Sequence, residues 1–499
     1  MEEKKIVIVD LGTRKLGVSV ATEGDGGKVK VLYYNEFPSA GISHGKVLNP
    51  SRLGIALKSA LAACEEFLQV KIKEAVVNIQ KYDIREISVN SSIQIEQGHC
   101  IDTEDIDNLE SLIWIEAQNC QNPGEEVFGI VPQSFDADSE MNVNVKDVTG
   151  MMAEILYGHY KAYIGKGSYR NNIDMAFREA GIETVRTTFS PTETGQCILT
   201  APEMDGGVAL LDIGAGASSV SIFTGGTLRH YGAIPFGGDS ITGDIVNLCG
   251  VDERLAENIK MGYGGLMPDR LSSLGEKTLK ITDTANGNKI EITAKYLSEI
   301  ITARMREILD ALLYEIQQSG YSEKLKNGVV VCGGCANTLN LCSMIKEISG
   351  YNARVGAPSV KIFDADMTFF GSAVASSAGI ITQSIGCDMK ACTEASDDDD
   401  VPQVELSLTE LFLPTEEEKN EKEEKKDTLI EKLRRKEEER KRKEEEKRRK
   451  EEEKRREKEE KRLQREEEKK NEGKSTLGGI FDSISDSLFG SENDQDNEI

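Results

Sequence analysis

Long apolar runs, clustered histidines and an excess of positive charge are all missing from this sequence of 499 residues. No stretch reaches the ~18 consecutive apolar residues that a helix needs to cross a bilayer, which excludes an ordinary membrane-spanning helix. The four histidines are scattered along the chain and predict no histidine metal site. The net charge of −26 would repel nucleic-acid phosphates, so we expect no nucleic-acid partner.

Disulfide-forming patterns are also missing. Ten cysteines are spread along the chain, several of them in apolar helical contexts, and we recognise no secretory signal. This usage predicts free, mostly buried thiols and a protein of the reducing cytosol.

Large apolar residues become rare toward the C-terminus. Between positions 415 and 474 they are only Leu429, Ile430, Leu433 and Leu463. We therefore expect the folded part to end at about residue 385 and a charged linker to cover 386–474. Frequent opposite charges four residues apart favour a single helix, about 90 Å long for about 60 residues, over a disordered spacer. No heptad seam is present that would predict a coiled coil.

Two short segments carry most of the functional information: Asp10-Leu11-Gly12-Thr13 and Asp212-Ile213-Gly214-Ala215-Gly216. Each follows an apolar run and precedes a β-rich run, so each is predicted to be a turn between two strands. Glycines in such a turn let an anion approach, and its backbone N–H groups can cradle phosphate. A carboxylate beside phosphate needs a cation, so we expect Asp10 and Asp212 to hold Mg²⁺ through water. Either loop alone is also compatible with an ordinary turn, but the pair predicts two similar domains closing on one nucleotide.

The secondary structure expected around these loops repeats. In the first half, strands are predicted over 6–9, 18–21, 29–37 and 75–79, with a helix that begins at Pro50. In the second half, strands are predicted over 208–211, 218–223, 227–234 and 328–331, with helices over 239–249, 252–260, 294–319 and 339–348 and a hairpin turn at Asn286-Gly287. The repeated plan predicts a duplicated α/β fold.

A further α/β region lies between the two halves. It has a helix predicted over 103–118, a strand over 127–131 and a strand-like run over 150–163. A helix over 171–180 and a strand over 183–189 follow it.

These motifs resemble those of the actin, sugar-kinase and chaperone ATPase superfamily. The two Asp loops resemble its phosphate loops, Val330-Val-Cys-Gly333-Gly334 resembles its adenosine loop, and Ala256-Glu257-Asn-Ile-Lys260 resembles the helix that frames ribose and adenine. Within that superfamily, roughly residues 4–383 resemble the bacterial cell-division family FtsA. The segments that carry this resemblance include Ile130-Val-Pro-Gln-Ser-Phe135, Asp147-Val-Thr-Gly-Met151, Phe223-Thr-Gly-Gly-Thr-Leu-Arg-His230 and Ile234-Pro-Phe-Gly-Gly-Asp-Ser-Ile-Thr-Gly-Asp244.

The resemblance implies an α/β, actin-like fold of two domains with duplicated, ribonuclease-H-like topology. The first domain would cover 1–83 and 167–204, with an α/β subdomain inserted at 84–166. The second would cover 205–385, with a smaller subdomain near 240–320, before the charged tail.

The resemblance also implies ATP and Mg²⁺ as cofactors and a set of nucleotide contacts. These are Asp10, Gly12, Thr13, Lys15, Asp212, Gly214, Gly216, Glu257, Lys260, Gly333 and Gly334. Judged from the residues alone, Lys15 is equally compatible with simple solvent exposure, and Glu257 with Lys260 is compatible with a surface ion pair.

Catalysis is the least defined part of the prediction. Glu193 and Gln196 are candidates for positioning an attacking water, as polar residues on this segment do in actin-like sites. Ala217 stands where the family usually has threonine, which removes a hydroxyl near the phosphates. We therefore expect at most a weak ATPase.

The sequence becomes apolar again at 475–490, where a short amphipathic helix is predicted. Its apolar face would carry Leu477, Ile480, Phe481, Ile484 and Leu488, with Phe489 at the edge. Such a helix can lie on a membrane surface, as the FtsA family's C-terminus does, or dock in a groove of a partner protein. The polar face lacks Lys and Arg, but periodicity and resemblance favour the membrane.

The resemblance implies a cytoskeletal adaptor of cell division, on the cytoplasmic side of the inner membrane at the division site. It would polymerise, tether the FtsZ ring to the membrane, and contact other division proteins through the inserted subdomain. Two alternatives share the fold: an actin-like pilus or secretion platform, and a sugar or acetate kinase.

Overall fold

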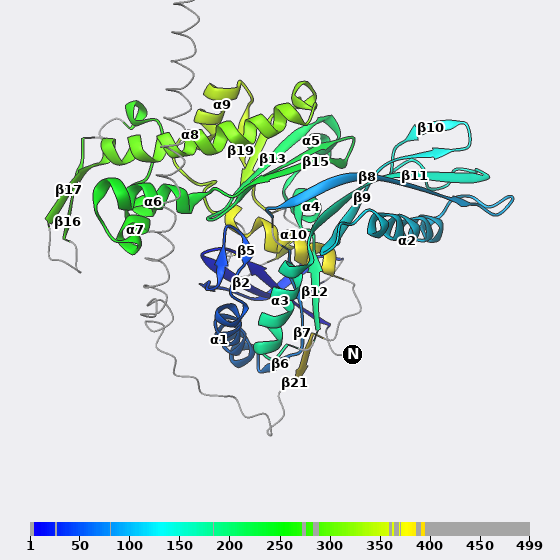
Figure 1. Ribbon diagram of the computed structural model, residues 1–499, viewed down its shortest axis with the longest axis horizontal. Helices are drawn as coiled ribbons and strands as arrows, with labels where there is room; N and C mark the ends of the chain where they lie inside the picture. Colours follow the sequence, from blue (N-terminus) through cyan, green and yellow to red (C-terminus); the bar gives the residue numbers. More distant parts are fainter. Residues whose placement is uncertain are drawn as a thin grey trace, which may run out of the picture. The chain divides into compact units, whose positions relative to one another are not determined.

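Figure 1 shows the computed structural model, which describes residues 4–24, 27–79, 81–182, 184–271, 276–282, 289–358, 362–363, 369, 371–385 and 391–394. The amphipathic helix expected at 475–490, the turn at Asn286-Gly287, and all of the expected linker except 391–394 lie outside these residues.

The first large sheet has six strands in the order β12-β7-β1-β2-β3-β20. Their bounds are β1 Lys5–Leu11, β2 Lys15–Glu23, β3 Val29–Pro38, β7 Glu74–Asn78, β12 Thr184–Thr188 and β20 Ile362–Phe363. The first three form an antiparallel meander, while β7 runs parallel to β1, and β12 runs parallel to β7. The predicted meander and the strand that follows it are confirmed.

The second large sheet repeats this topology. Its order is β15-β14-β13-β18-β19, with β13 Val208–Ile213, β14 Ser218–Thr224, β15 Thr227–Ile234, β18 Val329–Cys332 and β19 Ala353–Val355. Again three antiparallel strands come first, followed by two strands parallel to the first of them. Across the turn, Asp10 pairs with Gly17 and Asp212 pairs with Ser219. Each Asp therefore occupies the same position relative to its turn. The predicted duplication is therefore confirmed: apart from β20, the two sheets share the same strand order and pairing.

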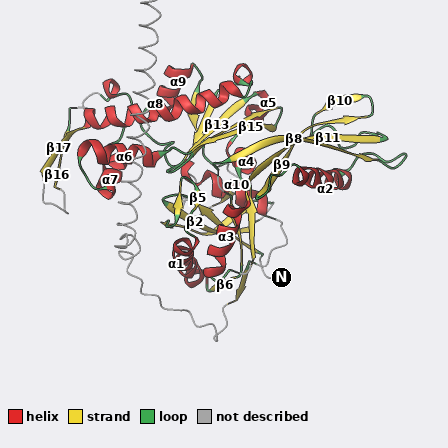
Figure 2. Cartoon of the chain, viewed as in Figure 1, coloured by secondary structure: helices red, strands yellow, loops and turns green. Residues whose placement is uncertain are grey.

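Helices cover the two sheets and connect them, as Figure 2 shows. Their bounds are α1 Pro50–Leu68, α3 Gly167–Glu179, α4 Pro191–Ile198, α5 Ala201–Gly206, α6 Gly238–Cys249, α7 Glu253–Tyr263, α8 Ala294–Gln318, α9 Leu341–Ser349 and α10 Ala375–Ser384. α1 packs on α3 and on the first sheet, α8 packs on β14 and β15, and α10 packs on α4 and β1. Asn49 caps α1 by accepting a hydrogen bond from the Arg52 N–H, and Pro50 opens the helix as predicted.

An inserted α/β unit stands apart from the two large sheets in Figure 1. Its antiparallel sheet has the order β10-β9-β11-β8, with β8 Ile84–Gln94, β9 Glu125–Ala137, β10 Glu140–Val143 and β11 Ile155–Lys166, and it packs on α2 (Thr103–Asn119). The unit has its own core, in which Phe135 and Tyr160 make an edge-to-face contact with ring centroids 5.9 Å apart.

The described fold also has three two-stranded antiparallel sheets: β4 Ile42–Ser43 with β5 Lys46–Val47, β16 Thr278–Thr282 with β17 Lys289–Thr293, and β6 Val70–Ile72 with β21 Cys392–Glu394. The last pair shows that ordered structure extends past the boundary at about 385 that composition predicted. A short edge strand is held by backbone hydrogen bonds, so it needs no apolar run to mark it.

One expected strand begins later than predicted. The strand-like run at 150–163 is a strand only from Ile155 onward. Gly150 has φ +91°, which belongs to a turn and not to a strand. Among the described helices, none is long and apolar enough to cross a membrane.

The core of the inserted unit gives a stability prediction. Phe135 is fully buried, so Phe135→Ala should lower the free energy of unfolding by about 3–5 kcal/mol through lost burial and a cavity. Met141 of the same unit is 72% exposed, and Met141→Ala is the control, expected to change little. Urea unfolding of both variants, followed by circular dichroism, measures the difference. Equal unfolding curves for the two variants would contradict this packing.

Candidate functional site

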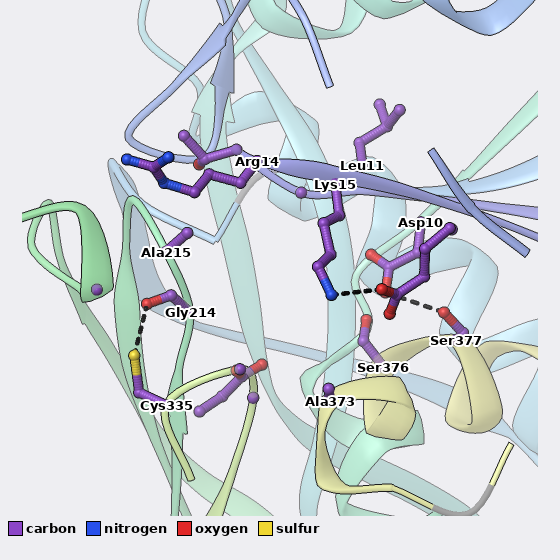
Figure 3. Close-up of a pocket in the computed structure, with 18 of the residues that line it drawn as sticks. Asp10, Leu11, Arg14, Lys15, Gly214, Ala215, Cys335, Ala373, Ser376 and Ser377 are labelled. Carbon is purple, nitrogen blue, oxygen red and sulfur yellow. Dashed lines mark hydrogen bonds and ion pairs between the residues drawn. The ribbon is translucent and has the colours of Figure 1, made fainter. Parts of the chain in front are cut away.

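A pocket lies where the two Asp loops face each other, and Figure 3 shows the residues around it. It is an open cleft with a cavity volume of about 210 Å³. Its lining includes ten of the eleven predicted nucleotide contacts: Asp10, Gly12, Thr13, Lys15, Asp212, Gly214, Glu257, Lys260, Gly333 and Gly334.

The first loop is a tight turn between β1 and β2. The Gly12 N–H donates to the Lys15 carbonyl at 3.0 Å, and a Cβ at Gly12 would stand 2.7 Å from that oxygen. Asn78, at the end of β7, accepts the Leu11 N–H at 2.7 Å through Oδ1. The end of the parallel strand thus fixes the backbone just before the turn.

The second loop has the same turn. The Gly214 N–H donates to the Ala217 carbonyl at 3.1 Å, and a Cβ at Gly214 would stand 2.9 Å from that oxygen. Gly238, at the start of α6, donates its N–H to the Gly214 carbonyl at 2.9 Å. The loop is therefore held against the beginning of a helix, where backbone N–H groups favour an anion.

The two loops touch each other through Gly216. A Cβ there would stand 2.5 Å from Thr13 Oγ1 and 3.0 Å from the Cα of His44. Thr13 Oγ1 accepts the Gly45 N–H at 3.0 Å, and the His44 ring lies 3.2 Å from the Gly216 carbonyl. Gly216 is not part of the pocket lining; its missing side chain lets the loops of the two sheets pack together.

Lys81, which belongs to none of the sequence motifs, interacts with the carboxylates of Asp212 and Asp10. The Lys81 ammonium forms an ion pair with Asp212 Oδ2, and the two side chains are 23% and 12% exposed. Burial raises the pKa of Asp10, while Lys81 and a 3.0 Å hydrogen bond from Ser377 oppose that rise. Burial lowers the pKa of Lys81, but Asp212 and Asp10 outweigh it and raise that pKa above its usual value. The Lys81 ammonium therefore stays charged and attracts the carboxylates of both Asp212 and Asp10.

Arg14 bridges the pocket from the first loop to the helices of the second sheet. Its guanidinium pairs with Asp239 of α6 and, at 2.7 Å, with Glu253 of α7. The Arg14 side chain is 29% exposed and Glu253 is 72% exposed, so we expect each pair to stabilise closure only modestly.

Glu257 and Lys260 form a small network in the pocket, so they are not a solvent-exposed pair. Lys260 Nζ lies 2.7 Å from Glu257 Oε2, 2.9 Å from Thr242 Oγ1 and 3.1 Å from the Gly238 carbonyl. Burial raises the pKa of Glu257, but the bonds from Lys260 and Thr242 outweigh this and lower it. The pair ties α7 to the first turn of α6, next to the second loop.

The loop after β18 closes the pocket opposite the first sheet. Gly333 has φ +88°, and a Cβ there would stand 2.5 Å from Asp212 Oδ1, so the loop reaches this close only because the residue is glycine. Gly334 faces open space, with no atom within 4 Å of an added Cβ. Cys335 Sγ lies 3.7 Å from the Gly214 carbonyl (Figure 3), and burial raises the pKa of its thiol to about 11.

The other sequence candidates lie elsewhere. Lys15 lines the pocket, but its 61% exposed side chain pairs with Glu36. Glu193 and Gln196 are on α4, outside the pocket lining: Glu193 Oε1 accepts from Thr188 at 2.9 Å, and Gln196 bonds to Gln383 of α10. Their role in positioning water stays a prediction. Ala217 is buried and also outside the lining.

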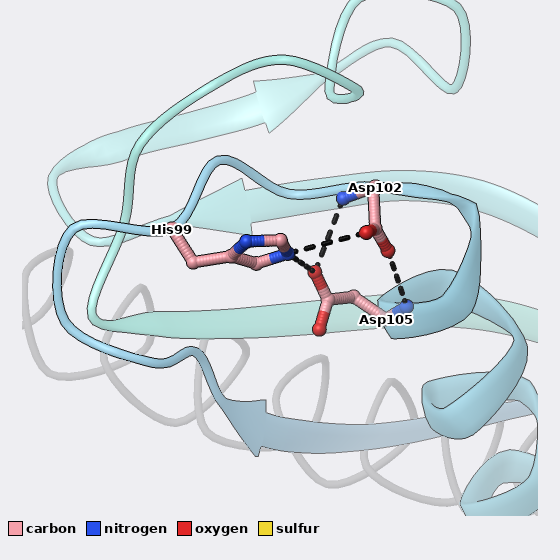
Figure 4. Close-up of side chains that lie close together, drawn as sticks. All are labelled: His99, Asp102 and Asp105. Atoms are coloured by element: carbon pink, nitrogen blue, oxygen red, sulfur yellow. Dashed lines mark hydrogen bonds and ion pairs between the residues drawn. The ribbon is translucent and has the colours of Figure 1, made fainter.

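A second group of possible ligands lies at the start of α2, as Figure 4 shows. His99 Nε2 is 3.2 Å from Asp102 and 3.3 Å from Asp105. Both carboxylates already cap the helix, because Asp102 accepts the N–H groups of Glu104 and Asp105 while Asp105 accepts that of Asp102. Helix capping accounts for this cluster without a metal.

Two duplicated sheets, each ending in an Asp-Gly turn that faces a shared pocket, define an actin-like protein. The PilM–PilN type IV pilus biogenesis complex is a solved structure with this fold, with a TM-score of 0.53 at 15% identity, covering 76% of this chain and 98% of that chain. The predicted fold class is therefore confirmed.

The comparisons with relatives are more specific. Residues 209–379 match the family model for cell division protein FtsA. The chain is 27% identical over 360 residues to cell division protein FtsA of Neisseria meningitidis serogroup B, covering 72% of this chain and 84% of that protein. It is 26% identical over 353 residues to cell division protein FtsA of Streptococcus pneumoniae serotype 2, covering 70% and 75%. The predicted resemblance to the FtsA family of cell division proteins is confirmed. The pilus-platform and kinase alternatives are not favoured.

Proposed function

We propose that this protein binds ATP with Mg²⁺ between two actin-like domains. The observation that carries the proposal is the meeting of two equivalent Asp-Gly turns in one pocket, beside the Glu257–Lys260 network and Gly333-Gly334. The turns would take the phosphates, since their glycines leave room for an anion. Gly334 would lie against the base, because it faces open space.

The donor chemistry of the pocket fits a divalent cation. Asp10 and Asp212 offer carboxylate oxygens, which Mg²⁺ prefers, and they stand at equivalent ends of β1 and β13. They would hold the ion through water, and the ion would neutralise nucleotide phosphates. Lys260 and Glu257 would fix α6 and α7 beside the nucleotide.

We further propose that the chain polymerises, tethers FtsZ and binds the inner face of the cytoplasmic membrane at the division site. The similarity to cell division protein FtsA supports the FtsZ and polymer parts. The apolar face at 475–490 supports the membrane part. A single short helix binds a membrane weakly, and a polymer would multiply its avidity. The inserted unit, with its own sheet and core, is a surface that other division proteins could use.

Gly334 offers a test of nucleotide binding that leaves the fold intact. An added Cβ at Gly334 meets no protein atom within 4 Å, so Gly334→Leu should place an apolar side chain at the pocket and weaken binding of a fluorescent ATP analogue by about tenfold or more. Gly262→Leu is the matched control, because that glycine also faces open space but is exposed on α7, outside the lining. Thermal unfolding checks that both variants fold. Equal affinity in the two variants would reject a nucleotide in this pocket.

The apolar face of the C-terminal segment tests the membrane anchor. Replacing Ile480 and Phe481 by Asp should abolish co-sedimentation with phosphatidylglycerol-containing vesicles, in the presence of ATP and Mg²⁺, because it charges the face that would enter the lipid. Replacing Ser483 and Ser485 by Asp adds the same charge on the opposite face and should reduce binding much less. If removal of 475–499 leaves vesicle binding unchanged, the anchor lies elsewhere.

A further inference from the structure

The Lys81 ammonium lies beside Asp212, where the proposed Mg²⁺ would bind. Lys81 follows β7, belongs to the first domain, and pairs with Asp212 of the second. The nucleotide-site motifs of the sequence did not include it, because it lies between an apolar strand and the start of the inserted unit. Two carboxylates from the two sheets and one ammonium thus form a single, partly buried charge cluster in the pocket.

Lys81 supplies positive charge to this cluster of two acids. The Ser377 hydroxyl donates a hydrogen bond to the Asp10 carboxylate, and the positive charge of Lys81 attracts that carboxylate. Asp212 is 9% exposed and has the Lys81 ammonium as its direct partner. Removing one member of a buried ion pair leaves a charge without compensation, which is strongly destabilising.

The backbone of Lys81 is anchored separately from its side chain. The Tyr231 hydroxyl donates to the Lys81 carbonyl at 2.6 Å. Tyr231 packs edge-on against Phe189 and Tyr163, with ring centroids 5.1 and 6.1 Å apart. The ammonium can therefore leave Asp212 by side-chain rotation, without moving the aromatic cluster that joins the domains.

We propose that the Lys81 ammonium is a resident counter-ion of the Asp10–Asp212 pair, and that a divalent cation must displace it from Asp212 in order to bind. The inference rests on the proposed Mg²⁺ site. Without metal, the Lys81 ammonium pairs with Asp212 and supplies the positive charge in the pocket. With metal, the ammonium is released toward the space that the phosphates would occupy, where it adds positive charge. The metal and Lys81 are thus competitors for one carboxylate.

A nucleotide-free stability measurement tests this competition on the full chain. In EDTA, Lys81→Met should melt at a lower temperature than the wild type, because two buried acids lose their counter-ion. Millimolar Mg²⁺ should raise the melting temperature of Lys81→Met by about 2–4 °C or more and that of the wild type by clearly less. Lys146→Met is the control: Lys146 lies outside the pocket lining and pairs with Asp205, so its response to Mg²⁺ should equal that of the wild type.

A second measurement on the unaltered protein covers the case in which Lys81→Met does not fold. Acetic anhydride labels accessible amines, and peptide mass spectrometry compares Lys81 with Lys146. Mg²⁺ alone should raise labelling at Lys81 severalfold and leave Lys146 unchanged. Equal Mg²⁺ shifts in Lys81→Met and wild type, or Lys81 labelling that ignores saturating Mg²⁺, would overturn the proposal. Neither measurement contains nucleotide, so such a failure is separate from a failure of ATP binding at Gly334.

Discussion

Two carboxylates, Asp10 and Asp212, lie in one pocket between the two large sheets, and positive charge must be supplied there. Asp10 and Asp212 are placed by the two copies of one sheet topology, each at the turn that follows the first strand. Like charges so placed repel each other unless a cation lies between them. Lys81 supplies that cation within the chain, and Mg²⁺ with nucleotide would supply it from outside. The second constraint on the site is the distance between the two loops.

That distance is set by contacts that cross the pocket. Thr13 and Gly216 bring the two turns together, and Arg14 ties the first turn to α6 and α7. Tyr231 joins β15 to the segment that carries Lys81. A cation that moves Lys81 would therefore act on groups connected to both domains. The proposed binding of a cation and nucleotide would thus reach both sheets through the same contacts.

The residues that the sequence predicted and those that it missed differ in a physical way. Asp10, Gly12, Asp212 and Gly214 were predictable because each belongs to a local strand–turn–strand pattern that occurs twice. Lys81 belongs to no such pattern: its role depends on long-range pairing of β1 with β7, which brings it to Asp212 from 131 residues away.

The same reasoning explains the fold. The meanders and long helices follow from local periodicity, so they could be predicted. The short strand β21 could not, because its pairing with β6 depends on backbone hydrogen bonds to a distant edge. Gly216 was assigned to the nucleotide on its position in the loop, whereas the structure shows it at the contact with Thr13 and His44. Local patterns identify the loops, and only the assembled fold shows which side of a loop faces the pocket.

The central claim is that Asp10 and Asp212 share one cation site, served by Lys81 in the free protein and by metal in the bound one. A crystal structure of the full chain with Mg²⁺ and a non-hydrolysable ATP analogue tests it most directly. The account predicts phosphates between the turns at Gly12 and Gly214, the metal near both carboxylates, and the Lys81 ammonium moved from Asp212 toward the phosphates. A nucleotide bound elsewhere, or an intact Lys81–Asp212 pair beside bound metal, would contradict it.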